Sequence, residues 1–390
     1  MIRAGMVSLA VCWALVAGCA ARPSAPATSA ARAEEPSAPH AEAALYPGMP
    51  QYPPTGDVYA AAGPGMLLPE VAKDRELVYV PTTIDDQLFV IDPKTYRVIA
   101  TYPGGAEPQH VVPSYDLRTL YVTGSRVPGG SILPVDPRTG KPGTMLPIQD
   151  VYNLYFTPDG RQAIVVAEEY RRLDYYALPG WTPVKSLRYP KCAGINHMDY
   201  TRDGRVMLFS CEFAGRMLAL DAVTGRQLRL FDLGPPEHTM PQDTRLVPDG
   251  TAFLVADMHA GGVHIFDGTA TRRTGFVKTG DGAHGIYFSR DGSVAYVSNR
   301  GEGTVTVLDL ATMKPRTTWQ IPGGGSPDMG GVSADGRTLW LAGRYHGEVY
   351  ALSTETGKLL ARIPVGDGPH GLAVWPQPGR YSLGHTSNIR

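Results

Sequence analysis

The sequence has no excess of charge of one sign. Its 390 residues include 36 Lys and Arg against 37 Asp and Glu, a net charge of −1, and its basic pairs, such as Arg171-Arg172, are isolated. Proteins that coat nucleic acid neutralise phosphates with clustered Lys and Arg, so we expect no nucleic-acid partner. The sequence also lacks a nucleophile elbow, a P-loop and any His-x-x-x-His or Cys-x-x-Cys pair. No enzyme class is indicated, and we favour a binding protein over an enzyme.

The composition argues against a helical protein. The chain contains 45 Gly and 35 Pro, more than a fifth of its residues, and both residue types are unfavourable inside helices. Hydrophobic residues make up 43% of the chain, which is enough to form a core and excludes disorder throughout. The sequence therefore favours short strands joined by many turns.

No long apolar run marks a membrane span near the start of the chain. Residues 7–16 form an apolar stretch of about ten residues, too short to cross a bilayer. This stretch follows a short basic start, which predicts a secretory signal over residues 1–18. Residues 19–62 are rich in Ala, Pro and Ser, and we expect a disordered tether there. The folded domain is predicted over residues 63–390.

The end of the signal resembles the lipobox of bacterial lipoproteins. Val16-Ala17-Gly18-Cys19 places two small residues before a cysteine. The resemblance implies cleavage before Cys19, lipidation of that residue, and contact with the membrane through the lipid anchor only. Ala20 replaces the Asp that acts as a retention signal in lipoproteins. We therefore expect an exported protein on the periplasmic side of the outer membrane or at the cell surface. An ordinary cleaved signal is the alternative.

The folded part repeats with a period of about 44 residues, which is typical of propeller blades. Each unit has an apolar strand, an Asp-Gly turn, a second strand such as residues 294–299, a third strand and a more polar outer strand. We predict an all-β, seven-bladed propeller of four-stranded antiparallel blades, in which C-terminal strands complete the N-terminal blade. Eight blades are the alternative. The repeating turn aspartates are Asp116, Asp159, Asp203, Asp249, Asp291 and Asp335.

The second strands carry a family resemblance. Residues 295–299, Ala-Tyr-Val-Ser-Asn, and residues 120–124, Leu-Tyr-Val-Thr-Gly, resemble the Tyr-Val-Thr-Asn motif of YVTN-repeat propellers. Pro369-His370-Gly371 resembles the Pro-His-Gly that precedes innermost strands in that family. The chain is similar to YncE-like proteins and, more distantly, to the haem-binding propeller of nitrite reductases. The resemblance implies a seven-bladed disc but no single activity.

The starts of the innermost strands should share one face of the disc and converge around its axis. A second tier is expected from the ends of the second strands, although adjacent strand residues point in opposite directions and either of two could face inward. The first tier consists of His110, Asn153, His197, Asp243, His284, Asp328 and His370. The second tier is drawn from residues 168–169, 211–212, 257–259, 299–300 and 344–346, and the site candidates among them are Glu212, Asp257, Arg300 and Arg344.

Three interpretations of this ring stay open. The first is an ordinary polar, water-filled channel mouth. The second is a transition-metal site for Cu or Zn, since His nitrogen and Asp oxygen suit such ions. The third is a small anionic ligand or substrate held by Arg300 and Arg344, with His284 or His370 as acid–base groups, as in a lactonase-type hydrolase or a redox protein. The candidate metal ligands are His110, His197, His284, His370, Asp243 and Asp328.

Two cysteines remain if Cys12 leaves with the signal and Cys19 is lipidated. Cys192 and Cys211 lie at similar distances on either side of a predicted turn, so they should meet at the open end of one hairpin. In an oxidising compartment we expect a disulfide, which closes a loop of about 20 residues and contributes about 3 kcal/mol. A thiolate ligand beside His197 and two free thiols are the alternatives.

These observations predict a monomeric, lipid-anchored, extracytoplasmic propeller. It binds a small molecule, a metal or a protein partner at the face of its central channel. A metal-dependent enzyme that uses the His and Asp ring is the alternative function.

Overall fold

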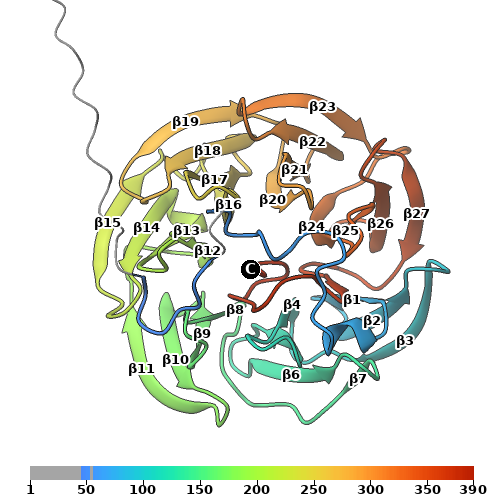
Figure 1. Cartoon of the computed structure of the whole chain (residues 1–390), viewed down its shortest axis with the longest axis horizontal. Coiled ribbons are helices and arrows are strands. Elements are labelled where there is room, and N and C mark those ends of the chain that lie inside the picture. Colours follow the sequence, from blue (N-terminus) through green and yellow to red (C-terminus); the bar gives the residue numbers. More distant parts are fainter. Residues whose placement is uncertain (1–44, 53–55) are drawn as a thin grey trace, which may run out of the picture. The chain divides into compact units, whose positions relative to one another are not determined.

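The computed structural model describes residues 45–52 and 56–390, and the predicted signal, Cys19 and most of the predicted tether lie outside these residues. The chain divides into residues 1–43 and a compact unit from residue 44 to residue 390. Within that unit the strands form seven four-stranded antiparallel sheets arranged around an axis (Figure 1). The seven-bladed propeller is confirmed, and the eight-bladed alternative is wrong.

The strands are grouped here by their position in the blade. The innermost strands are β28 (Ala373–Trp375), β4 (Pro108–Pro113), β8 (Asn153–Phe156), β12 (Ile195–Tyr200), β16 (Pro241–Leu246), β20 (Ala283–Phe288) and β24 (Pro327–Val332). The second strands are β1 (Leu77–Thr82), β5 (Leu120–Gly124), β9 (Gln162–Ala167), β13 (Val206–Cys211), β17 (Ala252–Asp257), β21 (Val294–Asn299) and β25 (Thr338–Gly343).

The remaining strands lie further from the axis, and two short 3-10 helices accompany them. The third strands are β2 (Gln87–Asp92), β6 (Ser131–Asp136), β10 (Arg172–Ala177), β14 (Arg216–Asp221), β18 (Gly262–Asp267), β22 (Thr304–Asp309) and β26 (Glu348–Ser353). The outer strands are β3 (Arg97–Pro103), β7 (Lys141–Pro142), β11 (Thr182–Arg188), β15 (Gln227–Asp232), β19 (Arg273–Lys278), β23 (Lys314–Gln320) and β27 (Leu359–Pro364). The helices are η1 (Val71–Lys73) and η2 (Glu212–Ala214).

Burial follows the position of a strand in its blade. The innermost strand β12 is buried at every residue, whereas the outer strand β3 alternates between exposed and partly buried residues. Inner strands lie between two neighbouring blades and bury both faces, so their sequences are apolar on both sides. The core therefore consists of layers between blades, as where the ring centroids of Tyr155 in one blade and Phe209 in the next lie 6.2 Å apart. This packing holds the innermost strands in place around the axis.

The ring closes where the C-terminal strand β28 pairs with β1. Trp375 lies opposite Leu77, and its indole nitrogen donates to Asp74 at 2.9 Å. The Asp74 carboxylate thus belongs to the closing blade, which joins the two ends of the domain and leaves no exposed sheet edge at the junction.

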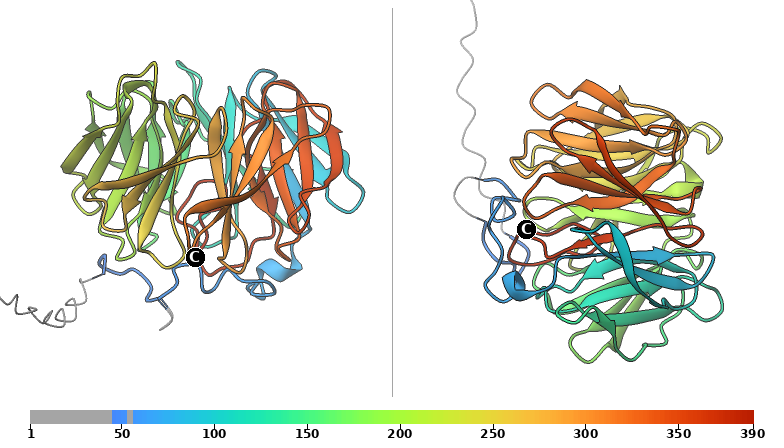
Figure 2. Two further views of the ribbon diagram at one scale, coloured as in Figure 1. Left: turned by 90° about the horizontal axis from the view of Figure 1, so that it is seen from above. Right: turned by 90° about the vertical axis from the view of Figure 1, so that its right-hand side faces the viewer.

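Residues 376–390, called here the C-terminal tail, turn back toward the axis after β28 (Figures 1 and 2). Phe156 donates its backbone N–H to Leu383 at 3.0 Å, and His385 donates to Leu154 at 2.9 Å. The tail backbone approaches β8 closely because Gly384 has no side chain, and a Cβ there would collide with Leu154 and Tyr155. The tail thus fills the channel near the C-terminal ends of the innermost strands.

A buried ion pair holds the end of the tail. The Arg390 guanidinium lies 2.6 Å from Asp199 Oδ1, and neither side chain is exposed. Asn388 also donates to Asp199, at 2.8 Å, and Arg245 donates to Ser387 at 2.8 Å. Because an unpaired buried charge is costly, these contacts oppose withdrawal of the tail from the channel.

The predicted end of the tether at residue 62 lies too late in the sequence. Residues 45–52 and 56–62 pack against the propeller, and Met49, Val58 and Ala62 are buried. Val58 donates its backbone N–H to Pro248 at 2.8 Å. The Ala and Pro content of this segment suggested a solvated chain. Its few apolar side chains nevertheless pack against the Asp-Gly turns of the blades.

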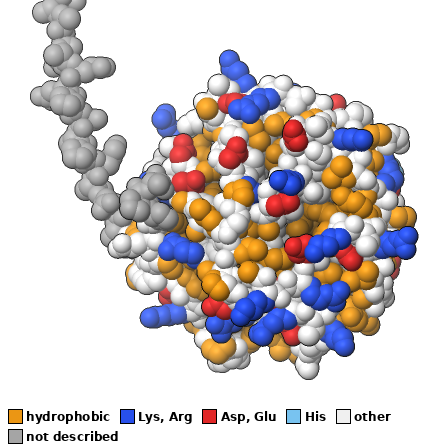
Figure 3. Space-filling view, turned by 45° about the vertical axis from the view of Figure 1, so that its right-hand side comes forward, with side chains coloured by type: hydrophobic (Ala, Val, Ile, Leu, Met, Phe, Trp, Pro, Cys, Tyr) orange, Lys and Arg blue, Asp and Glu red, His pale blue; other side chains and the backbone are white. Residues whose placement is uncertain are grey.

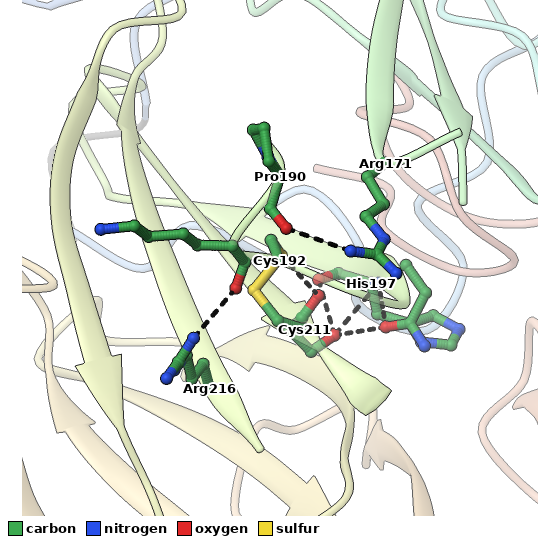
Figure 4. Close-up of a disulfide and its surroundings, with 9 residues drawn as sticks. Arg171, Pro190, Cys192, His197, Cys211 and Arg216 are labelled. Carbon is green, nitrogen blue, oxygen red and sulfur yellow. Dashed lines mark hydrogen bonds between the residues drawn. A yellow bond between two sulfur atoms is a disulfide. The ribbon is translucent and has the colours of Figure 1, made fainter. Parts of the chain in front are cut away.

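Cys192 and Cys211 form a disulfide, and both residues are buried (Figure 4). It joins the segment before β12 to the end of β13. Arg171 and Arg216 donate to the backbone carbonyls of Pro190 and Lys191 beside it, at 3.2 and 3.4 Å. The cysteines are therefore not free thiols, and the thiolate-ligand alternative is wrong for this structure.

The surface of the propeller is mixed in charge. On the face shown in Figure 3, Lys and Arg side chains alternate with Asp and Glu instead of forming one basic patch. In the part of the chain that the structure describes, no helix is long and apolar enough to cross a membrane.

Candidate functional site

The innermost strands carry a β-bulge at the same place in five of the seven blades. In β4, for example, Pro108 pairs with Gly124 and Val111 with Val122, so two residues face the single residue Thr123. A bulge interrupts the alternation of side chains, which explains why a simple strand pattern did not decide which residue points inward. The bulged pairs are Gln109-His110, Asn196-His197, Gln242-Asp243, His284-Gly285 and Asp328-Met329.

Hydroxyl groups on the second strands stabilise three of these bulges. Thr123 accepts the backbone N–H of His110 at 3.1 Å, and Ser210 accepts that of His197 at 3.1 Å. Ser298 accepts the N–H of Gly285 at 2.8 Å. Thr123 also donates to the Tyr152 carbonyl of the next blade, at 3.1 Å. The Thr and Ser of the Tyr-Val-Thr and Tyr-Val-Ser motifs therefore shape the channel wall.

Histidines that are far apart in the sequence meet in one place: three lie on bulges, one precedes β28 and one belongs to the C-terminal tail. We call this cluster the hub: His110, His197, His284, His370 and His385, with the carboxylates of Asp243 and Asp328. None of the seven side chains is more than 3% exposed. The ring centroids of His110 and His370 are 4.8 Å apart, and those of His197 and His385 are 5.0 Å apart. The four histidines expected from the sequence do converge on the axis.

The fifth histidine, His385, was missed because it belongs to the C-terminal tail. Its ring lies 5.3 Å from that of His110, and its Nε2 lies 3.2 Å from Asp243 Oδ1. The tail follows the last strand and has no repeat partner, so the 44-residue period gives no position for it. One signal was available in the sequence. Fifteen residues follow the last predicted blade, and they include His385.

One hydrogen bond determines the tautomer of His110. Its Nδ1 lies 2.9 Å from the Tyr152 carbonyl, which can only accept, so Nδ1 carries the proton. The Nε2 lone pair then faces Nε2 of His197 at 3.4 Å. Room for the ring comes from Gly371 of the Pro-His-Gly motif, because a Cβ there would collide with the His110 imidazole.

Four of the hub histidines, His110, His197, His370 and His385, are buried next to one another, which favours their neutral form. Burial, followed by the neighbouring imidazoles of His370, His385 and His197, lowers the pKa of His110 well below its usual range. Burial also lowers the pKa of His197 and of His385. Burial lowers the pKa of His370 to about 3, against the opposing effect of Asp328. Neutral imidazoles keep a lone pair that can bind a ligand.

Asp328 organises the side of the hub formed by His284 and His370. It accepts from His370 Nδ1 at 2.8 Å, lies 2.9 Å from His284 Nδ1, and pairs with Arg300 at 3.3 Å. Burial alone would raise the pKa of Asp328. The pKa is instead held well below its usual range by His284, Arg300 and His370. Because both histidines present Nδ1 to this carboxylate, each keeps Nε2 for another partner.

Asp243 contacts the histidine of the C-terminal tail, as Asp328 contacts His284 and His370. Its Oδ2 accepts from Arg245 at 3.3 Å and from the Ile286 N–H at 2.9 Å, while Oδ1 faces His385. Burial opposes ionisation, but Arg245 and then His385 lower the pKa of Asp243. Asn153, another predicted ring residue, lies 3.4 Å from His385 through its amide nitrogen.

The second-tier residues behave differently from one another. Arg300 is 9% exposed, its Nε has no partner, and its guanidinium lies over the Tyr345 ring at 5.2 Å. Arg344 is half-buried and donates to the Gly368 carbonyl at 3.3 Å. Glu212 accepts from Asn196 at 2.6 Å. These three leave polar groups near the channel mouth.

Asp257, the fourth predicted residue of this tier, contacts backbone groups and one histidine. Its Oδ1 accepts the backbone N–H groups of Met240 and Ala260, each at 2.8 Å, and its Oδ2 lies 3.0 Å from His264 Nε2. These contacts of the carboxylate all lie within its own blade, and the contribution of Asp257 to the site stays a prediction. The sequence could not show these contacts because the end of a second strand supplies both site residues and loop caps.

Glu168 is a further group at this site. It lies at the end of β9 and its Oε1 is buried without a partner. Burial, followed by Glu212 and Asp150, raises the pKa of Glu168 well above its usual range. Burial and the two neighbouring carboxylates thus favour the protonated form of Glu168 more than in a free glutamate.

These features define the class of the protein: a seven-bladed β-propeller whose bulged innermost strands gather neutral imidazoles at the channel axis. Residues 71–378 match the family described as YncE-like β-propeller, and the chain belongs to that family. The resemblance inferred from the Tyr-Val-Thr-Asn motifs is thus confirmed.

Among curated proteins, the chain is similar to Protein NirF of Pseudomonas aeruginosa. The two are 37% identical over 125 residues, which cover 32% of this chain and 31% of NirF. The match therefore spans less than a third of the length of that relative.

Several solved structures share the fold. A protein from Desulfotomaculum acetoxidans has a TM-score of 0.61 at 17% identity, covering 77% of this chain and 98% of that chain. Hydrazine synthase from Kuenenia stuttgartiensis has a TM-score of 0.58 at 16% identity, covering 73% of this chain and 94% of that chain. The dihydro-heme d1 dehydrogenase NirN, solved in complex with DHE, has a TM-score of 0.55 at 14% identity, covering 84% of this chain and 82% of that chain. At these identities the likeness shows the fold alone.

The hydroxyl that stabilises the first bulge gives a testable consequence. Replacing Thr123 by Val keeps the shape but leaves the His110 N–H and one lone pair of the Tyr152 carbonyl unsatisfied. We expect the free energy of unfolding to fall by about 1–3 kcal/mol in urea titrations. Thr182→Val on the outer strand β11, where the residue is exposed, is the control and should change stability by less than about 0.5 kcal/mol. Equal stability of the two variants would contradict this role of Thr123.

The neutral hub also predicts a loss of stability in mild acid. The unfolded chain protonates His370 below its ordinary pKa of 6.5, whereas the folded chain keeps it neutral down to about 3. As the pH falls through this range, the unfolded state binds a proton that the folded state does not bind. The free energy of unfolding therefore decreases. Between pH 6.5 and 4.5, the free energy of unfolding of metal-free His370→Gln should decrease by about 2 kcal/mol less than that of the metal-free unmodified protein.

Urea unfolding at several pH values measures this difference. His238→Gln, at an exposed histidine, is the matched control and should follow the unmodified protein. The same slope in all three proteins would mean that His370 is not held neutral in the folded state.

Proposed function

We propose that the mouth of the channel binds a small organic ligand that bears carboxylates, and that haem-type tetrapyrroles are its class. The observation that carries the proposal is the Asp328 centre, where two imidazoles present Nδ1 to one carboxylate. A histidine that binds a metal commonly donates its other N–H to a carboxylate, which orients the ring. His370 and His284 meet this condition for the axial histidine of a haem iron.

The charges near Asp328 suit such a ligand. Arg300 keeps a buried Nε without a partner, and Arg344 makes one hydrogen bond to a backbone carbonyl. Guanidinium groups bind carboxylates through paired hydrogen bonds, so these two side chains would hold acidic substituents of the ring. His284 and His370 are each 2% exposed, so binding requires side chains at the mouth to move. Tyr345, 66% exposed over Arg300, is free to do so.

The relatives add support of a different kind. The fold is shared with NirN, whose structure contains DHE, and a part of the chain is similar to NirF. The iron of a bound haem would supply the redox or ligand-binding chemistry, while the chain orients the axial imidazole and holds the carboxylates.

Titration with hemin tests this proposal. We expect saturable binding of one hemin per chain, seen in the Soret band, and loss of the histidine-ligated spectrum in His370→Ala. Arg344→Gln should weaken binding about tenfold, because it removes a charge-assisted hydrogen bond of about 1.5 kcal/mol. His238→Ala and Arg161→Gln, both at exposed side chains, are the controls. Identical spectra and affinities in His370→Ala and His238→Ala would overturn the proposal.

We also propose that the chain is exported and lipid-anchored through Cys19. The disulfide between Cys192 and Cys211 supports an oxidising compartment, and the lipobox resemblance supports the anchor. In a bacterial host the unmodified protein should partition into the detergent phase of a Triton X-114 extract. Cys19→Ala should enter the aqueous phase or remain uncleaved, and Cys12→Ala should behave as the unmodified protein. Recovery of the unmodified protein in the aqueous phase would contradict the anchor.

A further inference from the structure

Three histidines of the hub lie closer together than ordinary packing requires. His110 on β4, His197 on β12 and His385 on the C-terminal tail each offer a ring nitrogen, and these nitrogens all lie within 4.8 Å of one another. All three side chains are fully buried. They come from three separate parts of the chain, so no local spacing brings them together.

The hydrogen bonds of these rings leave lone pairs without donors. His110 uses its proton at Nδ1 for the Tyr152 carbonyl, so its Nε2 can only accept. His197 faces this atom with Nε2 and has no partner for Nδ1. A buried polar atom without a partner is rare in native proteins. Nε2 of His110 and Nε2 of His197 therefore face each other at 3.4 Å with at most one proton between them, and a cation between the rings could be bound by both lone pairs.

We propose that His110, His197 and His385 bind a divalent transition-metal ion, with Zn²⁺ as the reference ion and Cu²⁺ as the competitor. Imidazole nitrogen suits both ions. The nearest pair of nitrogens, 3.4 Å apart, fits two ligands of one tetrahedral ion at about 2.0–2.1 Å each. Three protein ligands leave a fourth position open, which distinguishes this site from a closed structural zinc site.

The surroundings supply the partners that such ligands need. The Tyr152 carbonyl orients His110, and the Asp243 carboxylate lies 3.2 Å from His385 Nε2, so Nδ1 of His385 is the atom available to the ion. Asn153 contacts that Nδ1 at 3.4 Å and would yield its place. Carbonyl and carboxylate partners of this kind orient metal-binding histidines and increase their basicity.

The tail makes the site depend on the folded disc as a whole. His385 reaches the hub only while Arg390 and Asn388 hold Asp199, and while the backbone of Gly384 lies against β8. A metal ion would therefore link the tail to two blades, so binding of the ion and docking of the tail stabilise each other. This inference does not depend on the proposed tetrapyrrole ligand.

Zinc binding to the full folded domain tests the inference. Protein without a polyhistidine tag is stripped with EDTA, dialysed and titrated with Zn²⁺ in a competition assay with a chromogenic chelator, and bound metal is counted by elemental analysis. We expect one Zn²⁺ per chain and at least a hundredfold weaker binding in His385→Ala and in His197→Ala. His238→Ala, at an exposed histidine, should bind as the unmodified protein.

Two further measurements distinguish the loss of a metal ligand from misfolding of the variant. Zn²⁺ at about a hundred times its Kd should raise the melting temperature of the unmodified protein and of His238→Ala by about 3–5 °C, but not that of His385→Ala. Co²⁺ should give the intense visible bands of a four-coordinate ion in the unmodified protein and in His238→Ala, but not in His385→Ala.

Two results would overturn the inference. One is less than about a fifth of an equivalent of Zn²⁺ or Cu²⁺ bound to the unmodified protein. The other is binding by His385→Ala that equals binding by His238→Ala, which would remove the tail from the site even if His197 were still required.

Discussion

The geometry of the hub depends on the hydrogen bonds that stabilise one bulge on each of several innermost strands. A bulge leaves a backbone N–H without its ladder partner, which is costly in a buried place. Thr123, Ser210 and Ser298 accept these N–H groups, and Thr123 and Ser298 also donate to a carbonyl of the next blade. The same hydroxyls therefore direct the site side chains and connect adjacent blades.

Charge at the hub is balanced locally, which keeps the imidazoles neutral. Asp328 pairs with Arg300, Asp243 with Arg245, and Asp199 with Arg390. Because each buried carboxylate already has a guanidinium, the histidines need not be protonated to neutralise it. Their lone pairs are then not occupied by protons, which is the state that the proposed iron and zinc sites require. Binding chemistry at the hub thus follows from the arrangement of its neighbours.

Much of the fold could be predicted because it repeats. The Asp-Gly turns and four-strand units indicated seven blades, and the starts of the innermost strands indicated His110, His197, His284 and His370 near one axis. The prediction failed where the repeat offers no comparison. Residues 45–62 follow no blade pattern but pack on the disc where they are described. Asp257 has the position of a site residue, and its contacts within its own blade could not be predicted either.

The sequence by itself determined the propeller architecture, the turns, and which residue types stand at the start of each innermost strand, because these depend on local periodicity, whereas ring closure in the structure decided for seven blades over eight. Only the tertiary structure decided which of two adjacent side chains enters the channel, since a bulge changes strand alternation through contacts with the neighbouring strand. The position of His385 likewise depends on a tail that meets β8 and Asp199 across the axis. Contacts between segments so distant in the chain leave no periodic trace in the sequence.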